Sequence, residues 1–444
     1  MVMKKEWLLL IVTVVVTILL ALGLIRVFAP QLLGVSADLR MVQVSEEVVP
    51  FYENIFREED LRSDDFLLQD PYTNIRAKPL FSNPFRYEGP HDILGFRNRS
   101  VPNIADIITI GDSNTYGVNA ALEENWPGQL ARHLDEKSPL LYNMSTGGWG
   151  AVQYLDMFAK ALHFKPRVVI VAFYTGNDAL ESTLLAYNAD QWRSLRPDRD
   201  LSVSTIPGGK DLWADTWEAR FDDGVTTTFT PELRLASNRD VGYIRAGYAI
   251  MAAVAERIDS MAAESETPVI FTIIPTKEMV YTEKVAAQGI EAPQGYNDLI
   301  TAEKRNITTL AAALAALPNA IYVDLVAPLQ KAALKAVPLY LPLPNGHPLP
   351  AGYGEIARAL SPAVDRYLPR KPEGLLMVGK EEKIILVREG GIYLFNAPEL
   401  VTANGWRAAD VQAVSLRDII DLPLRDVIKT VDPARYGPGA FPAR

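Results

Sequence analysis

The chain has 444 residues, of which 48% are hydrophobic and 22% charged, so a large core is possible and wholesale disorder is excluded. Lys and Arg total 44 against 54 Asp and Glu, a net charge of −10, which argues against nucleic acid as a partner because phosphate binding needs a basic surface. The absence of cysteine excludes disulfides, zinc–thiolate sites, iron–sulfur clusters and thiol catalysis. Four histidines leave little material for a metal site, and we expect neither metal nor cofactor.

The N-terminus contains an uncharged apolar run over residues 7–25. As a helix it would be about 28 Å long, close to the thickness of one hydrocarbon core. Lys4 and Lys5 precede it, which favours a cytoplasmic N-terminus. We therefore predict an uncleaved single-pass membrane anchor at 1–29, with the bulk of the chain on the extracytoplasmic (periplasmic) side. A cleaved signal peptide and a buried core helix are the alternatives.

The rest of the chain divides into three parts by composition. Residues 30–80 are acidic and show no sustained hydrophobic period, and we interpret them as a stalk or linker. Residues 81–370 alternate apolar runs with helix-length segments, interrupted by a polar insertion at about 181–239. Residues 371–444 are predicted to form a small module that contains β-structure, with protein partners possible through it.

The pattern of 81–370 predicts a three-layer α/β/α domain with a parallel sheet. The continuous apolarity of 167–174 is typical of a strand buried on both faces. In chain order, the expected elements are a strand at 106–110, a helix at 123–137, strands at 167–174 and 268–274 separated by a helix at 240–263, a helix at 296–317, a strand at 320–325 and a helix at 350–367. In the C-terminal module we expect a hairpin over 383–395, turning at Gly390-Gly391, and a short helix near 415–427.

The residues that could carry chemistry follow these strands. Ser113 lies directly after the 106–110 strand, where a parallel sheet presents its ligands. A serine hydroxyl becomes a nucleophile only with a base and with donors for the oxyanion. The candidates for both lie in three later segments, Asn143–Gly150, Gly176–Asp178 and Asn345–Pro348.

These four segments, in this order, resemble the motifs of the SGNH (GDSL-type) hydrolase superfamily over about residues 81–370. The run Asp92–Asn98 is similar to one found ahead of the first motif in extracytoplasmic members. The resemblance implies a flavodoxin-like fold, and it implies Ser113 as nucleophile and His347 as the base. It also implies an oxyanion hole and two supporting residues, in this sequence the Ser113 N–H, the Gly148 N–H and the Asn177 side chain, with Asp112 and Asn345 in support.

The motif around His347 departs from the family pattern. The superfamily usually has an aspartate three residues before the histidine, where this chain has Pro344. Envelope O-acetyltransferases that resemble the superfamily, such as those acting on alginate, have it two residues before, where this chain has Asn345. Residues 274–281 are also similar to a segment of envelope members related to those acetyltransferases. Asp178 and Asp324 are the alternative carboxylates.

Two functions follow from these residues. The first is an anchored extracytoplasmic serine esterase or O-acyltransferase acting on an acyl ester of an envelope glycan or a small molecule. The second is an envelope scaffold that keeps the fold but has weak or no catalysis, which the missing aspartate and the additional C-terminal module favour. Trp192, Trp213 and Trp217 in the insertion are either sugar-stacking platforms or anchors of a long loop.

Overall fold

The computed structural model describes residues 65–70, 72–82, 89–134, 137, 139–203, 216–231, 241–369, 372–378, 383–415, 418–419, 422 and 424–440. The predicted anchor at 1–29 and Trp213 lie outside these residues. Among the helices of this part of the chain, none is long and apolar enough to cross a membrane.

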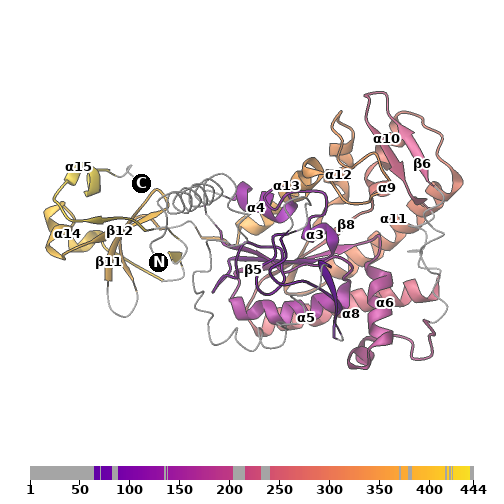
Figure 1. Cartoon of the computed structure of the whole chain (residues 1–444), viewed down its shortest axis with the longest axis horizontal. Coiled ribbons are helices and arrows are strands. Elements are labelled where there is room, and N and C mark those ends of the chain that lie inside the picture. Colours follow the sequence, from indigo (N-terminus) through magenta and orange to yellow (C-terminus); the bar gives the residue numbers. More distant parts are fainter. Residues whose placement is uncertain are drawn as a thin grey trace, which may run out of the picture.

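A five-stranded parallel sheet forms the centre of the molecule (Figure 1). Its spatial order is β4-β3-β5-β8-β9, so the chain starts next to one edge, moves to that edge and returns across the sheet to the other. The strands are β3 (Ile107–Gly111), β4 (Leu141–Asn143), β5 (Val168–Tyr174), β8 (Val269–Ile274) and β9 (Ala320–Asp324).

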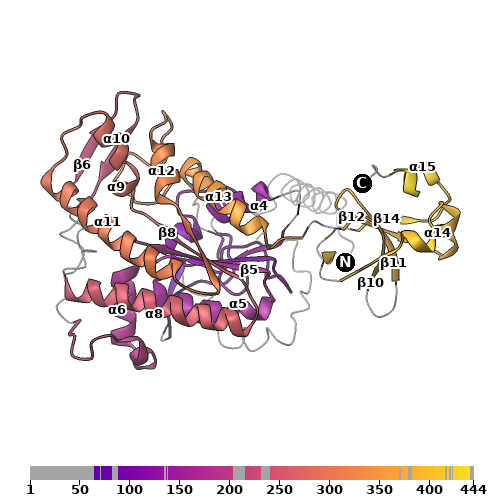
Figure 2. The ribbon, with the colours of Figure 1, turned by 180° about the vertical axis from the view of Figure 1, so that it is seen from behind.

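Helices cover both faces of this sheet (Figures 1 and 2). One layer contains α4 (Trp126–His133), α12 (Val326–Ala333) and α13 (Pro350–Asp365). The other layer contains α5 (Ala151–Ala161), α6 (Asp178–Asn188) and α8 (Gly242–Glu264), with α11 (Gln294–Ala315) packed beside α8 and β9. Shorter helical turns are α3 (Ser113–Tyr116), η4 (Leu162–Phe164), α9 (Lys277–Val280) and α10 (Thr282–Ala287). The predicted three-layer α/β/α architecture is confirmed.

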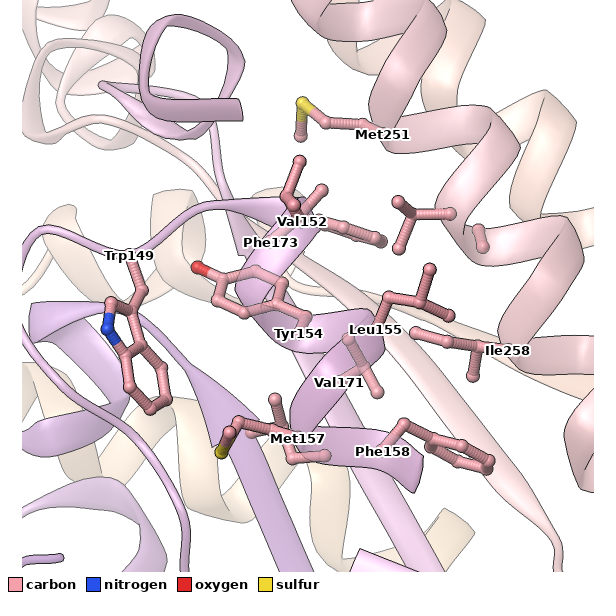
Figure 3. Close-up of a cluster of buried hydrophobic side chains, with 14 of the residues drawn as sticks. Trp149, Val152, Tyr154, Leu155, Met157, Phe158, Val171, Phe173, Met251 and Ile258 are labelled. Carbon is pink, nitrogen blue, oxygen red and sulfur yellow. The ribbon is translucent and has the colours of Figure 1, made fainter. Parts of the chain in front are cut away.

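The core explains why residues 167–174, predicted as a strand, are continuously apolar. All seven residues of β5 are buried, and its side chains alternate between two hydrophobic clusters, one under each helix layer. Val171 and Phe173 point into the cluster that also contains residues of α5 and α8 (Figure 3). Phe173 stacks on Phe271 of the neighbouring strand β8 at a ring-centroid distance of 5.9 Å.

The predicted strands and long helices of the domain are present with shifts of a few residues at their ends. The strands of the central sheet and the layer helices that sequence analysis did not predict are β4, α5, α6 and α12. Strand β4 has only three residues, too few for a recognisable period. Helix α6 begins at Asp178, the last residue of a predicted motif, and runs to Asn188. The insertion predicted to start at about 181 therefore begins inside a helix.

Part of the predicted stalk belongs to the domain. Strands β1 (Leu67–Asp70) and β2 (Asn74–Ala77) form an antiparallel hairpin. The indole N–H of Trp149 donates to the Ile75 carbonyl at 2.6 Å, and Gln153 Nε2 donates to the Thr73 carbonyl at 3.0 Å. The boundary predicted at residue 80 is therefore too late, because backbone carbonyls of this hairpin are hydrogen-bonded by the segment that follows β4.

The insertion contains ordered structure where no period was visible. A 3₁₀ segment (Asp190–Leu195) extends α6, and β6 (Trp217–Arg220) pairs with β7 (Thr226–Phe229) in a hairpin. Trp192 is buried and donates its N–H to the Tyr72 carbonyl at 3.2 Å, and Trp217 packs edge-on against Tyr296. These two tryptophans anchor the insertion to the body, which favours the second of the two roles considered for them.

The C-terminal module has a second five-stranded sheet of order β13-β10-β11-β12-β14 (Figure 1). Its strands are β10 (Gly374–Val378), β11 (Lys383–Arg388), β12 (Gly391–Phe395), β13 (Gln412–Val414) and β14 (Leu424–Ile428), with helices α14 (Glu399–Ala403) and α15 (Pro433–Tyr436). The hairpin is present, but it turns at Glu389-Gly390, both left-handed, one residue earlier than predicted. The short helix predicted near 415–427 is wrong over 424–427, where β14 pairs with β12, and residues 416–417, 420–421 and 423 lie outside the described residues.

The module contacts the α/β body at the end of the sheet away from Ser113. Arg167, which precedes β5, donates to Asp106 at 2.9 Å and to Asp418 of the module. Asp106 precedes β3, and Ser113 follows the same strand. The five residues of β3 separate the two ends by about 17 Å at 3.3 Å per residue.

Candidate active site

The nucleophile candidate Ser113 begins the short helix α3 directly after β3. Asp112 caps this helix, since its carboxylate accepts the Asn114 N–H at 2.9 Å. Gly117, with φ of +91°, ends the helix after a single turn. The strand end and the two caps together hold the half-buried Ser113 hydroxyl at the carboxyl edge of the sheet.

His347 lies on the loop before α13 and meets Ser113 across 234 positions of sequence. Its Nε2 is 2.8 Å from Ser113 Oγ, within the range of a strong hydrogen bond. The Ser113 hydroxyl lies farther from the Asp112 carboxylate, at 3.2 Å. A backbone bridge between Tyr340 and Pro348 and the bond from Leu349 N to the Leu339 carbonyl at 2.8 Å close the base of the loop.

Asn345 sets the tautomer of His347. Its Oδ1 accepts the backbone N–H of His347 at 2.9 Å, which identifies this atom as the amide oxygen. The same oxygen lies 2.9 Å from Nδ1 of the ring, so Nδ1 carries the proton. Nε2 is then left with its lone pair directed at the Ser113 hydroxyl, the arrangement that a general base requires.

A residue that sequence analysis missed supports Asn345 from behind. Asn119 Nδ2 donates to Asn345 Oδ1 at 3.2 Å and to the His347 carbonyl at 3.3 Å. Asn119 has φ of +68°, a left-handed conformation in which asparagine is enriched. The only sequence signal for it is its place in a turn shortly after the Gly111–Ser113 motif.

The segment after β4 contains two glycines, one of which borders Ser113. A Cβ at Gly147 would lie 3.7 Å from the Ser113 Cβ, so this residue borders the hydroxyl. Gly148 has φ of +76°, and a Cβ there would lie 3.4 Å from Ile75 of the β1–β2 hairpin. The structure therefore places the predicted Gly148 at a left-handed position beside the β1–β2 hairpin, and its neighbour Gly147 against the serine.

Asn177 follows β5 at the same edge of the sheet. It occupies the N-cap position of α6, but its side chain makes no capping hydrogen bond. An N-cap asparagine normally uses its oxygen on the helix. The half-buried amide is instead available to a ligand, as an oxyanion donor would have to be.

Buried carboxyl groups lie next to this edge. Burial raises the pKa of Asp112 to about 6 despite the hydrogen bonds from Asn114. Burial also raises the pKa of Asp178, with a smaller contribution from the Asp112 charge, and raises that of Glu181 to about 7.

Neither alternative carboxylate reaches the histidine. Asp178 accepts hydrogen bonds from the Tyr154 hydroxyl at 2.9 Å and from the Tyr174 N–H at 2.8 Å. Asp324 is exposed and accepts the Val326 N–H at 3.2 Å at the start of α12. The expectation that one of them could replace the missing aspartate is therefore wrong, because Asn345 occupies the position beside Nδ1. In the described part of the chain, no group of three or more His, Asp and Glu could hold a metal ion.

Comparison with known proteins gives the family. The model of the GDSL-like lipase/acylhydrolase family matches residues 109–354, more than half of the chain and all of the motifs above. The chain belongs to this family. The SGNH resemblance inferred from the four motifs is thereby confirmed, and the chain is a member of the GDSL-type hydrolase superfamily.

Several solved structures are similar to part of this chain. One is a lipolytic protein of the G-D-S-L family, described as putative, from Desulfitobacterium hafniense (15% identity, 58% of this chain and 97% of that chain, TM-score 0.32). Another is a catalytic mutant of an acetylxylan esterase from Geobacillus stearothermophilus (13% identity, 60% and 95%, TM-score 0.34). A third is a GDSL-like lipase from Bacteroides thetaiotaomicron (12% identity, 59% and 88%, TM-score 0.30). No curated protein matches the chain.

Proposed function

We propose that this protein is a serine esterase or O-acyltransferase that uses Ser113 and His347 on an acyl ester of an envelope glycan or a small molecule. The observation that carries the proposal is the 2.8 Å contact between Ser113 Oγ and His347 Nε2, with the ring oriented by Asn345. A serine and a histidine that met for structural reasons alone would not require a fixed Nδ1–H tautomer.

The reaction begins with acylation of the serine. Ser113 Oγ forms a bond to the acyl carbon while its proton moves to His347 Nε2. The negative charge on the carbonyl oxygen is stabilised by the backbone N–H of Ser113, by a backbone N–H of the Gly147-Gly148 segment and by the Asn177 amide. The bond from the acyl carbon to the alcohol oxygen then breaks, and the alcohol leaves with the proton from His347.

The second half of the reaction distinguishes a hydrolase from a transferase. Water or a sugar hydroxyl gives its proton to His347 Nε2 while its oxygen bonds to the acyl carbon. The bond from the acyl carbon to Ser113 Oγ then breaks, and His347 returns the proton to Oγ. Attack by water gives hydrolysis, and attack by a sugar hydroxyl gives transfer. Both use the same residues, so we keep both within the proposal.

The membrane anchor at 1–29 and the extracytoplasmic location belong to the same proposal. They are supported by the uncharged run 7–25 and by Lys4 and Lys5 ahead of it. A reporter that is active only outside the cytoplasm, fused after Arg444, should be active in cells. Activity of a cytoplasm-only reporter at that position would show that the topology is wrong.

The direct test of the active site is labelling of the full chain by a fluorophosphonate probe. The parent protein should be labelled at Ser113, Ser113→Ala should not be labelled, and His347→Ala should react at least 100-fold more slowly because no base remains. The alternative is an SGNH-fold envelope scaffold without catalysis. A folded parent protein that resists the probe and turns over no acyl ester would favour that scaffold.

A further inference from the structure

A buried lysine lies behind the loop that carries His347. Lys277 is the first residue of α9 and is 1% exposed. Its ammonium donates to the carbonyl oxygens of Leu343 at 2.9 Å and Asn345 at 3.1 Å, and to that of Thr228 in β7. An ammonium has three N–H donors, and these carbonyls, which come from two different segments, are enough to accept all three.

The backbone around Lys277 is fixed on both sides. Helix α9 begins two residues after β8 ends, and the N–H of Thr276 donates to Glu303 at 2.8 Å. On the other side, Glu278 accepts the Thr230 N–H at 2.9 Å. The lysine therefore extends from a rigid part of the domain into a loop without regular secondary structure.

Lys277 binds main-chain carbonyls near the tip of the loop, whereas Asn119 binds its side-chain and His347 groups. The Leu343 side chain is 55% exposed, and Pro344 is exposed as well. Asn345 donates its N–H to the Leu343 carbonyl at 2.7 Å, and its side chain faces His347 and Asn119. Lys277 holds the remaining polar group of Asn345, its carbonyl, so a loss of the ammonium would release the residue that orients the histidine.

We propose that Lys277 is a positioning residue, which keeps Asn345 and therefore His347 in register with Ser113. The β6–β7 hairpin of the insertion takes part, since Thr228 shares the ammonium and its hydroxyl donates to the Pro342 carbonyl at 3.2 Å. The neutral Asn345 amide orients the His347 ring by geometry alone. The position of the Asn345 backbone therefore matters more than it would for a residue with a charged carboxylate. This inference rests on the proposed function of the Ser113–His347 pair.

Lys284 provides a matched control. It is also a buried lysine, 2% exposed, on the next helix, and it bonds the Asp223 carboxylate at 2.6 Å and the Lys335 carbonyl at 3.1 Å. It has no hydrogen bond to residues 339–349 among those that the structure describes. Lys277→Met and Lys284→Met thus remove the same group at similar burial, but only the first removes contacts to the histidine loop.

The experiment measures fluorophosphonate labelling of the full chain over time, which separates the rate constant from the final labelled fraction. We expect Lys277→Met to label fully with a rate constant at least tenfold below that of the parent protein, because misplacement of reacting groups by about 1 Å can cost ~100-fold. For an acyl ester that the parent turns over, kcat should fall while KM stays within twofold. Lys284→Met should keep the parent's rate constant within threefold.

The outcomes distinguish the two proposals. If the parent protein is not labelled, the proposed function fails. If the parent is labelled but Lys277→Met shows only a lower labelled fraction with an unchanged rate constant, the lysine acts through stability and this inference is wrong. It is equally wrong if the two lysine variants slow the reaction alike. Should Lys277→Met not fold, Lys277→Gln is the substitute, because its amide nitrogen ends one bond short of the ammonium and its two N–H donors cannot serve all three carbonyls. A folded Gln variant that reacts at the parent's rate would overturn the inference.

Discussion

The Nδ1 of His347 lies 2.9 Å from the Oδ1 of Asn345, two residues before it. The amide oxygen fixes the ring tautomer, as a carboxylate would, but it cannot neutralise the imidazolium that forms when Ser113 loses its proton. The arrangement is therefore a Ser-His-Asn triad, in which orientation is retained and charge stabilisation is reduced. Slow turnover at neutral pH is the expected consequence.

Asn345→Asp should raise the rate of acylation by about tenfold or more, since a carboxylate keeps the bonds to His347 and stabilises the imidazolium. The measurement is the fluorophosphonate rate constant at pH 8. Asn345→Leu, which removes the acceptor, should lower the same rate constant. An unchanged rate for the Asp variant would mean that charge stabilisation at His347 does not limit acylation.

Asn119→Gly should slow acylation about three- to tenfold with little change in melting temperature. Glycine accepts the φ of +68° without strain, so the change removes only the amide that donates to Asn345 and His347. Asn74→Gly is the control, because Asn74 has a similar φ of +66° but is exposed in β2. Equal rates for the two variants would contradict a role for Asn119.

The two glycines after β4 should respond differently to alanine. A methyl group at Gly147 meets only the Ser113 Cβ, at an ordinary 3.7 Å, so Gly147→Ala should fold normally and lower kcat/KM for an acyl ester by about tenfold. Gly148→Ala must adopt a positive φ, at a cost of about 1–2 kcal/mol, and should lower the melting temperature by several degrees. Thermal melting and steady-state kinetics on both variants check this, and a Gly147→Ala variant with parental kcat/KM would place the substrate elsewhere.

Two adjacent buried groups should make opposite contributions to the pH dependence of stability. Burial raises the pKa of Asp92 to about 7 and lowers that of His91 to about 4. Between pH 4 and 6.5, the folded state therefore holds a proton on Asp92 and not on His91, whereas the unfolded state does the reverse. Asp92 makes the free energy of unfolding fall as pH rises in this window, and His91 makes it rise.

Replacing either residue should leave only the pH dependence of stability that the other contributes. The quantity to compare is the free energy of unfolding at pH 6.5 minus that at pH 5. This difference should be larger for Asp92→Asn than for the parent protein, and smaller for His91→Gln. Each shift is at most about 2 kcal/mol, the value for one proton over this interval. Urea denaturation at the two pH values gives the comparison, and shifts of the same sign in both variants would show that the two groups do not titrate as assigned.

The sequence by itself determined the sheet and the residues at its edge. A strand such as β5 must be apolar at every position when helices cover both faces, so its continuous apolarity indicates burial on both sides. The carboxyl ends of parallel strands meet at one edge of the sheet. That local physics is enough to predict the α/β/α layers and to bring Ser113 and Asn177 to the same side.

Only the tertiary structure decided which groups support His347. Asn119 and Lys277 lie 226 and 68 positions from Asn345 in sequence, and neither has a local pattern that distinguishes it from a turn residue or a helix-surface lysine. Their roles come from hydrogen bonds between loops, which depend on where each loop lies after folding. The β1–β2 and β6–β7 hairpins could not be predicted for the same reason, because strands this short are stabilised by the surface that they cover.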